Sequence, residues 1–397
     1  MRLELTSAQT EAQLGFRDYV DREIAPRADD YDRRQAIPRE AILCLAAQGY
    51  LGAVLPSSVG GLGLDAITLG LLHEEVGRGC SSLRSLLTVH SMVGFAVQRW
   101  GSAAQKRSWL PRLATGEALG AFALTEPNVG SDASGIEMTA THRDGSYVLS
   151  GRKRWITFGQ VADIFLVFAR FQGLPIALLV ERQTPGLRIE PIDGVLGTRA
   201  SMLAELHFDE CPVPRENLVG GVGFGFSAVG ASALELGRLS VAFGCVGIGQ
   251  ACLEACSRYT SERRQFGAYL KDHQLVRRMM TDMVTNVKAA RLLCFQASYM
   301  RDIGHPTATQ DAFVAKYFAS TMATRAARDA VQIHGANGCG PEYSVQRYLR
   351  DATVMEIIEG STQIQQITIA DQAYKPAVLS AHSVGSEARQ HLVAAGT

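Results

Sequence analysis

Apolar residues recur at helical spacing through the first part of the chain, and capping residues, prolines and glycines separate the runs. Helices are predicted over residues 7–27, 38–49, 65–78, 82–99 and 103–115. A loop rich in glycine, VLPSSVGGLGLD, divides the second of these helices from the third. We therefore expect an N-terminal helical domain over residues 1–118.

The pattern changes at Gly120, where short runs of alternating β-branched residues replace the helical spacing. Turn residues such as Asp144-Gly145 and Gln172-Gly173 separate these runs. Strands so short and closely spaced indicate a small antiparallel sheet or barrel rather than βαβ units. We expect a middle β domain over residues 119–225.

Helical spacing returns after Gly225, and the predicted helices cover residues 226–260, 270–302, 308–335 and 361–374. They predict a C-terminal domain like a four-helix bundle over residues 226–375. Residues 376–397 are rich in Ala, Ser and Gly and are predicted to be a frayed or disordered tail. The expected fold class is mainly α with a β insert (α+β), in the order helices, sheet, helices.

Charge and motif content exclude several functions. The chain of 397 residues carries 39 Lys plus Arg and 39 Asp plus Glu, so nothing suggests binding to nucleic acid or to an anionic membrane. The apolar, uncharged run Leu239 to Leu253 is too short to span a bilayer, and we expect no membrane insertion. P-loop, H-E-x-x-H and G-x-S-x-G motifs are absent, and no His or Cys pair has metal-ligand spacing. We therefore expect no metal site.

The scattered histidines and cysteines favour structural roles. His90 and His334 lie in apolar surroundings and are interpreted as structural histidines. The eight cysteines form no C-x-x-C pair and are expected to be buried free thiols in a reducing compartment. The N-terminal sequence lacks a secretory or transit pattern, so we expect a cytoplasmic protein.

Two polar stretches of the predicted β domain could face a ligand. In residues 121–135, backbone amides around Gly130 and Ser131 could bind a phosphate, although a polar turn between strands explains the same residues. In GRKRWITFG, Trp155 and Thr157 are two apart on a predicted strand and so face the same side. This pair suits a planar heteroaromatic ligand, or it is a core tryptophan beside an incidental threonine.

Two further stretches lie in the C-terminal block. In SERRQFGAYLKDHQ, Arg263, Phe266 and Gln274 could hold a pyrophosphate and an aromatic base, or they belong to a solvated charge run. In MEIIEGSTQIQQ, Glu359 follows two isoleucines, and apolar surroundings make a carboxylate a better base toward a carbon acid. Ser361 then begins a helix whose first N–H groups are free. An ordinary glutamate at a helix start is the alternative.

Together these stretches resemble the acyl-CoA dehydrogenase family over about residues 5–375. LTEPNVGSD, RWIT, ERRQFG followed by HQ, QIHGANG and EGSTQIQ stand in the order of that family. The resemblance implies an FAD enzyme that oxidises an acyl thioester, from CoA or an acyl carrier protein, to its trans-2-enoyl form. Glu359 would remove the α-proton while the β-hydrogen leaves as hydride to flavin N5. The base's own backbone N–H and a ribityl hydroxyl would polarise the thioester carbonyl.

The resemblance also assigns contacts residue by residue. Expected FAD contacts within one subunit are Phe122, Leu124, Thr125, Gly130, Ser131, Trp155, Thr157, Ser361 and Gln363. Positions expected to reach the FAD of a neighbouring subunit are Arg263, Gln265, Phe266, Gln274, Gln332 and Ala336. Expected substrate contacts are Ser131, Glu235, Arg238 and Gly360. The site would then be complete only in a homo-oligomer, either a dimer or the family's usual tetramer.

Some positions depart from the family pattern. Ile358 stands where an aromatic is frequent, and Gln265, Ala336 and Cys339 replace a usual Thr, Gly and aromatic. These departures concern pocket shape and adenine packing rather than the chemical step.

Several functional hypotheses follow from the resemblance. The first is a dehydrogenase that passes electrons to an electron-transfer flavoprotein. The segment LLTVHSMV, residues 86–93, looks like that of enzymes acting on carrier-protein-bound acyl groups in making unusual polyketide extender units. A flavin oxidase or monooxygenase on the same fold is a further alternative, and Glu359 argues against the monooxygenase. Glu359, Thr125, Trp155 and Thr157 argue against a non-enzymatic relative.

Overall fold

The computed structural model describes residues 4–374, so the tail predicted over residues 376–397 lies outside the described residues. The chain begins with a block of helices, in which Thr6 and Ser102 form capping boxes with Gln9 and Gln105. The helices of this block are α1 (Ser7–Tyr19), α2 (Ala28–Arg34), α3 (Arg39–Ala47), α4 (Ala66–Gly79), α5 (Ser81–Trp100) and α6 (Ala103–Thr115).

The first predicted helix differs from the structure. Residues 7–27 do not form one helix, because α1 ends at Tyr19 and a π-helical turn (Val20–Ile24) and a 3-10 turn (Ala25–Arg27) follow it. Pro26 has no N–H to continue the hydrogen-bond pattern. The short helix α2, which the sequence pattern did not predict, begins directly afterwards.

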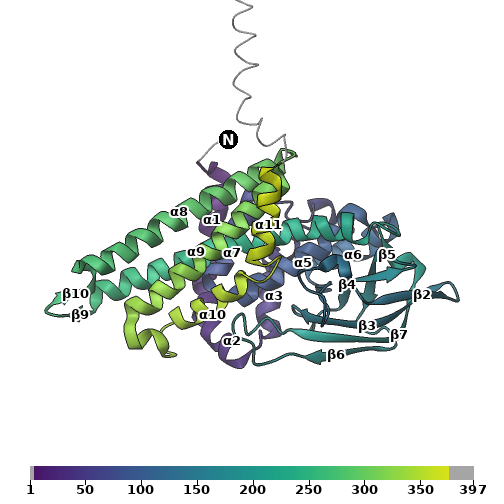
Figure 1. The fold of residues 1–397 in the computed structure, drawn as a ribbon, viewed down its shortest axis with the longest axis horizontal. Helices are drawn as coiled ribbons and strands as arrows, with labels where there is room; N and C mark the ends of the chain where they lie inside the picture. Colours follow the sequence, from purple (N-terminus) through teal and green to yellow (C-terminus); the bar gives the residue numbers. More distant parts are fainter. Residues whose placement is uncertain (1–3, 375–397) are drawn as a thin grey trace, which may run out of the picture.

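The middle of the chain forms one eight-stranded sheet, drawn beside the helices in Figure 1. Along the path β6-β7-β3-β2-β4-β5-β8 most neighbours are antiparallel, but β1 and β2 each pair with β4 in parallel. The predicted β insert is therefore confirmed, with these two parallel pairings as the difference. The strands are β1 (Gly120–Ala123), β2 (Thr139–Arg143), β3 (Ser146–Ile156), β4 (Ile164–Phe171), β5 (Leu174–Glu181), β6 (Leu187–Pro191), β7 (Ala204–Pro214) and β8 (Leu218–Val219).

Long helices make up the rest of the described chain, and together with the sheet they confirm the expected fold class. Helix α10, which the sequence pattern did not predict, packs against α7 and α9. The elements are α7 (Ala231–Glu262), β9 (Arg264–Gln265), β10 (Ala268–Tyr269), α8 (Gln274–Asp302), α9 (Ala308–His334), α10 (Val345–Met355) and α11 (Thr362–Ala373).

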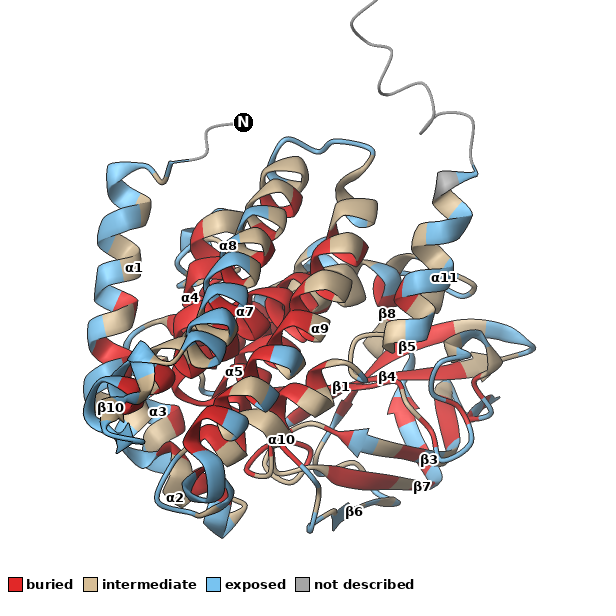
Figure 2. Ribbon diagram, turned by 60° about the vertical axis from the view of Figure 1, so that its left-hand side comes forward, coloured by how far each residue is buried: buried red, intermediate tan, exposed pale blue. Residues whose placement is uncertain are grey.

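Helix α7 lies at the centre of the helical core, where Figure 2 colours its middle part as buried. Its glycines allow very close packing: a Cβ at Gly247 would lie 2.1 Å from the carbonyl oxygen of Glu74 in α4. By length and composition alone, Gly225–Glu262 could cross a membrane, but 78% of its most apolar window is buried inside the fold. The apolar residues of this helix thus serve the core.

Helix α5 connects the helical core to the sheet. The His90 ring on α5 accepts from the N–H of Gly120 at 3.1 Å and donates to the Leu113 carbonyl at 2.9 Å. His334 is likewise buried, with Nδ1 2.8 Å from the Ala330 carbonyl and its ring stacked on Tyr259. Both are satisfied structural histidines, as predicted. All eight cysteines are free, but Cys44 and Cys339 are exposed rather than buried.

Candidate active site

Glu359 lies in the loop between α10 and α11, and its backbone is left-handed. Glu359 has φ 54° and Gly360 has φ 95°, so two successive residues adopt a conformation that side-chain-bearing residues rarely accept. Ser361 then caps α11, with its Oγ accepting from the Ile364 N–H at 3.4 Å. A strained non-glycine residue of this kind persists only where its surroundings hold it in place.

Two buried side chains hold this loop through hydrogen bonds to its backbone carbonyls. The Lys316 ammonium, fully buried on α9, donates to the Gly360 carbonyl at 2.7 Å and lies 3.4 Å from that of Glu356. The side-chain amide of Gln365, also fully buried, donates to the carbonyls of Glu359 and Gly360 at 3.1 and 3.0 Å. These bonds occupy the carbonyl oxygens of the left-handed pair and fix the direction of the Glu359 side chain.

The carboxyl group of Glu359 packs against the backbone of α7. A Cβ at Gly237 would lie 2.4 Å from its Oε2, so only glycine leaves room for the group. Oε2 is buried and has no hydrogen-bond partner among residues 4–374. Burial raises the pKa of Glu359 to about 6, although nearby Arg238, Arg84 and Lys316 oppose this shift. The group is therefore a desolvated carboxylate suited to accepting a proton near neutral pH.

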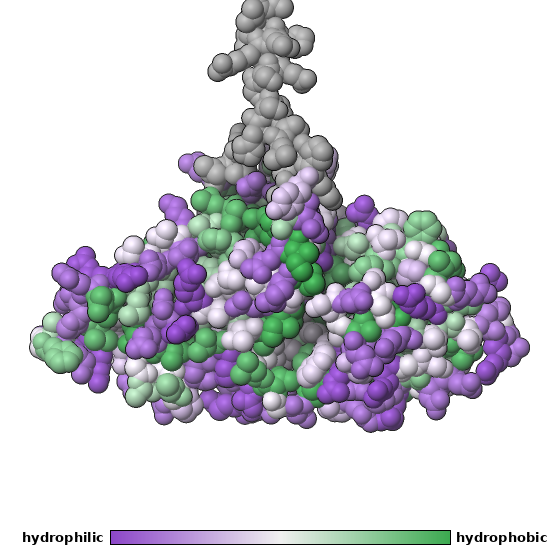
Figure 3. Space-filling view, viewed as in Figure 1, coloured by the Kyte–Doolittle hydropathy of each residue, from purple (hydrophilic) through white to green (hydrophobic). Residues whose placement is uncertain are grey.

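The outer side of the same segment is apolar. Ile357 and Ile367 are 63% and 58% exposed, and Figure 3 shows apolar surface over α11. The segment thus directs the Glu359 carboxylate inward and the side chains of Ile357 and Ile367 outward.

The two predicted substrate-contacting charges on α7 do not pair with each other. The Glu235 carboxylate accepts from Arg301 at 2.8 Å and from the Thr309 hydroxyl at 2.6 Å. The Arg238 guanidinium instead lies 4.2 Å from the centre of the Phe313 ring, and its Nε has no partner among the described residues. Arg238 is the one of the two that lies near Glu359 and retains free N–H groups.

On the sheet side, a buried ion pair fixes the segment that follows β1. Lys153 and Glu126 are buried and 2.6 Å apart, and Lys153 also donates to the Leu124 carbonyl at 3.0 Å. The Glu126 carboxylate further accepts the backbone N–H groups of Glu137 and Met138. The predicted cofactor residues Phe122, Leu124 and Thr125 therefore stand on a rigid edge of the sheet.

Trp155 and Thr157 are placed differently from the sequence prediction. The β3 ladder is irregular between Lys153 and Ile156, Trp155 has φ 63°, and β3 ends before Thr157. Regular strand alternation therefore does not relate the two residues, and that prediction was wrong. The Trp155 ring is 47% exposed, which is unusual for so large an apolar group.

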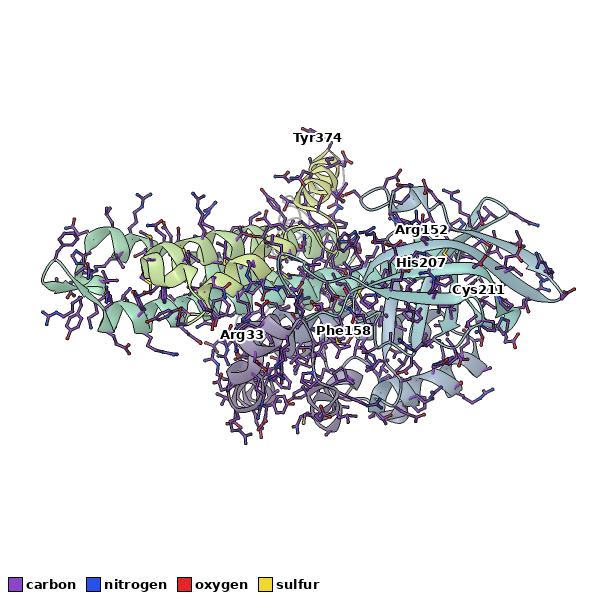
Figure 4. The ribbon with its side chains drawn as sticks, turned by 90° about the horizontal axis from the view of Figure 1, so that it is seen from below. Arg33, Arg152, Phe158, His207, Cys211 and Tyr374 are labelled. Carbon is purple, nitrogen blue, oxygen red and sulfur yellow. The ribbon has the colours of Figure 1, made fainter. Side chains whose placement is uncertain are left out.

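Phe158 anchors this irregular end of β3. It is also left-handed, with φ 54°, and is fully buried in the hydrophobic cluster of the N-terminal helices. Figure 4 shows it between those helices and the sheet. The exposed tryptophan is thus held by a backbone that is locked into the core three residues later.

Gly130 and Ser131, predicted to lie near a phosphate, are both exposed. A Cβ placed on Gly130 would meet no atom within 4 Å, so the space beside its backbone is open. Ser361 and Gln363 lie at the start of α11 beside the Glu359 loop.

The remaining predicted residues lie at the opposite end of the C-terminal helices. Figure 1 shows the β9–β10 hairpin at the far end of α7 and α8, away from the sheet. The six positions there are all exposed, and the Phe266 ring is 98% exposed. They are Arg263, Gln265, Phe266, Gln274, Gln332 and Ala336. One subunit does not bring them together with Glu359.

Sequence reasoning missed the side chains that support the site. These side chains are buried and polar, and they contact the Glu359 loop, contact the sheet edge or lie near Glu359. They are Lys316, Gln365, Lys153 and Arg84. A lone Lys or Arg within an apolar helical run is a signal that could have found Lys316 and Arg84. Gln365 gives no such signal, because its burial depends on how α11 packs.

The chain matches three family models: "Acyl-CoA dehydrogenase, N-terminal domain" over residues 6–117, the "middle domain" over 121–211 and the "C-terminal domain" over 223–374. A "Probable acyl-CoA dehydrogenase YngJ" of Bacillus subtilis (strain 168) is 38% identical, covering 94% of this chain and 100% of the relative.

Solved structures agree with these matches. Butyryl-CoA dehydrogenase from Megasphaera elsdenii superposes with a TM-score of 0.91 at 34% identity, over 94% of this chain and 100% of that one. FkbI, described as serving biosynthesis of the methoxymalonyl extender unit of the FK520 polyketide, superposes with a TM-score of 0.83 at 34% identity, over 91% and 99% of the two chains.

Fold, sequence and the placement of Glu359 thus agree. The chain belongs to the acyl-CoA dehydrogenase family of flavoprotein oxidoreductases, which act on CH–CH bonds of acyl thioesters.

Proposed function

We propose that this enzyme catalyses FAD-dependent α,β-dehydrogenation of an acyl thioester, with Glu359 as the base. The observation that carries this proposal is the Glu359 carboxyl group itself. Its Oε2 is buried without a partner among the described residues, and a left-handed loop held by Lys316 and Gln365 fixes its direction. A carboxylate held in this way is available to a substrate C–H rather than to the protein.

The residues around Glu359 support the proton transfer. Burial disfavours the ionised form, so proton uptake from the thioester α-carbon is favoured over that by a solvated carboxylate. The Glu359 N–H makes no backbone hydrogen bond within the described loop and can donate to a thioester carbonyl. Such a donor stabilises the charge that develops on the carbonyl oxygen as the α-proton leaves.

The predicted cofactor residues fit a large planar group. Trp155 presents an exposed aromatic ring on a rigid bulge, and open space adjoins Gly130. Phe122, Leu124, Thr125 and Thr157 complete our proposed FAD contacts on this side, with Ser131, Ser361 and Gln363. When bound there, the flavin supplies the acceptor for the hydride that leaves the β-carbon.

We propose that the hairpin end of the chain completes the FAD site of a second subunit, in a dimer or tetramer. Phe266 supports this proposal because its ring is almost wholly exposed on a left-handed backbone. An isolated chain gains nothing from so exposed an aromatic ring, whereas stacking on an adenine would bury it.

The acyl tether, CoA or an acyl carrier protein, is a finer proposal. The likeness to FkbI supports a role in making a polyketide extender unit, and with that role we propose a carrier-protein tether. Residues 86–93, which suggested this tether, are all buried within α5. They can shape an acyl pocket but cannot contact a carrier protein, so their support concerns the acyl group alone. We further propose an electron-transfer flavoprotein as acceptor and a cytoplasmic location, with which the free cysteines are compatible.

Anaerobic flavin reduction by a panel of CoA and carrier-protein thioesters tests the proposal. In Glu359→Gln, reduction should slow by about 10²–10⁴-fold while the protein stays yellow. Glu356→Gln is the matched control, since Glu356 lies in the same loop and its carboxylate accepts from the Thr362 hydroxyl at 3.1 Å. Unimpaired reduction by Glu359→Gln, or no reduction of the wild-type flavin by any thioester, would refute the assignment.

A further inference from the structure

Arg84 on α5 is a fully buried cation that forms no ion pair with a carboxylate within the described residues. Its exposed fraction is 1%, and none of the ion pairs among residues 4–374 includes it. Its guanidinium donates to the hydroxyls of Thr88 at 2.9 Å and Ser85 at 3.1 Å. Its Nε has no hydrogen-bond partner in the part of the chain that the structure describes. Burying a charge with only neutral and incomplete partners is costly, so the position demands a further acceptor.

A chain of buried hydroxyls holds the guanidinium in place. The Thr88 Oγ1 lies 2.5 Å from Ser240 Oγ on α7, which in turn lies 3.0 Å from Nδ1 of His73 on α4. Burial and the nearby Arg84 lower the pKa of His73 to about 3, so the ring is neutral and supplies no negative charge. Three helices thus fix the direction of Arg84 without balancing its charge.

Two glycines of α7 show where Arg84 lies relative to Glu359 along that helix. Glu359 packs on Gly237, whereas a Cβ at Gly244 would lie 2.8 Å from the Cδ of Arg84. Seven residues are close to two helical turns, so the two glycines lie on one face of α7, about 10 Å apart along its axis.

Contacts on the other elements agree with this placement. Arg84 Nη2 lies 3.2 Å from Sδ of Met355, four residues before Glu359. Met92, two turns beyond Arg84 on α5, is the side chain that adjoins Gly237 beside the carboxyl group. The base and the cation therefore line the same α5–α7 seam, with the cation deeper.

We propose that Arg84 is a specificity-determining residue, and that the acyl group of the substrate is short and ends in an oxygen acceptor, a carboxylate or a hydroxyl, bound by its guanidinium. This inference rests on the proposed function, because it takes Glu359 to mark the α-carbon. From there a chain of a few carbons reaches the Arg84 end of the seam. A purely hydrocarbon chain would leave the buried N–H groups unsatisfied, whereas a terminal oxygen would accept from them.

Binding to the flavin-loaded Glu359→Gln protein tests the proposal without turnover. Butyryl-CoA, 4-hydroxybutyryl-CoA and glutaryl-CoA share the tether and differ at the end of the chain. By calorimetry, at least one oxygen-bearing thioester should bind about 10-fold or more tightly than butyryl-CoA. The two oxygenated ligands separate a carboxylate from a hydroxyl. If butyryl-CoA binds as tightly as both, the proposal is wrong.

Substituting Arg84 in the Glu359→Gln protein tests whether Arg84 causes the preference among the thioesters. Arg84→Met keeps a long apolar side chain and should abolish the preference for oxygen-bearing thioesters. Arg84→Lys should retain part of that preference. Arg33→Met controls for lost positive charge, since Arg33 is an exposed arginine on α2 that pairs with Asp30 (labelled in Figure 4). A uniform change for all three thioesters would overturn the assignment and leave Arg84 as a structural residue or a countercharge to Glu359.

Two further measurements keep the outcomes separate. Melting temperature and flavin content show whether an Arg84 variant folds, and the wild-type preference in the ligand series needs no Arg84 variant. Failure of every thioester to reduce the wild-type flavin would refute the reaction, whereas a missing oxygen preference would refute only the Arg84 assignment.

Discussion

Two loops of this enzyme share one backbone geometry and differ in everything around it. Glu359-Gly360 and Phe266-Gly267 are both left-handed pairs, with φ of 54° and 95° in the first and 52° and 78° in the second. Lys316 and Gln365 hold the first pair inside the protein. The second pair is the two-residue turn of the β9–β10 hairpin, and only the local Arg264 donates to its Gly267 carbonyl.

The difference shows what each loop requires. Asn-Gly or Asp-Gly normally fills a hairpin turn of this type, so Phe at position 266 is an unfavourable choice for the hairpin alone. Glu359 is equally unfavourable for its own loop. In each case a strained backbone presents one side chain, inward for the carboxylate and outward for the ring. Side chains of the same chain hold the first loop, whereas our proposal places the binding partner of the second loop in another subunit.

Loosening the inner loop should have the largest effect. Lys316→Met removes the charged one of the two donors to the Gly360 carbonyl, and the protein should lose about 1–3 kcal/mol of stability. Because the carboxylate then loses its fixed direction, kcat should fall more than KM rises. Lys288→Met, an exposed lysine on α8, is the matched control. A rise in KM with unchanged kcat would mean that Lys316 supports substrate binding instead of the base.

The buried charge of Glu359 should lower the free energy of unfolding by a similar amount, and this effect depends on pH. Its pKa of about 6 in the folded protein lies above the ordinary value of 4.5, so the folded state holds this proton more tightly than the unfolded state. Raising the pH from 4.5 through 6 therefore destabilises the wild type by about 2 kcal/mol, and the penalty stays in full above 6.

Glu359→Gln removes this titration. Relative to wild type, the variant should gain about 2 kcal/mol between pH 4 and pH 8, measured by denaturant unfolding at equal flavin load. Glu356→Gln controls for a charge lost from the same loop. A stability difference between Glu359→Gln and wild type that is constant across this range would mean that the Glu359 carboxyl group is not desolvated.

The outer loop should respond least, and in a different property. Phe266→Ala should weaken FAD binding by about 3- to 10-fold, because one aromatic stacking contact is lost. Melting of the flavin-free protein should not change, since the ring contributes little to the packing of its own chain. Leu275→Ala, 72% exposed on α8, is the control. A lower melting temperature with unchanged FAD affinity would contradict the contrast between the two loops.

Local patterns predicted the helices and the β insert because they depend on spacing and caps. Helix α10 and the break at Val20–Ile24 were missed, since the first depends on packing against α7 and α9 and the second on Pro26. Glu359 could be found from its apolar flanks and the family resemblance. Gln365 and Gly237 could not, and the apolar run around Lys316 marks that residue without its role, because these roles arise only where α7, α9 and α11 meet. Trp155 was misplaced because a bulge interrupts the alternation of β3.

The central claim is that Glu359 removes the proton from the α-carbon of a bound thioester. Acetyl-CoA, or the acetyl-loaded carrier protein, has α-hydrogens but no β-carbon, so it reports this step without oxidation. In deuterated buffer the wild-type enzyme should exchange the α-hydrogens, as followed by mass spectrometry, and Glu359→Gln should not. Equal exchange by the two proteins would contradict the account.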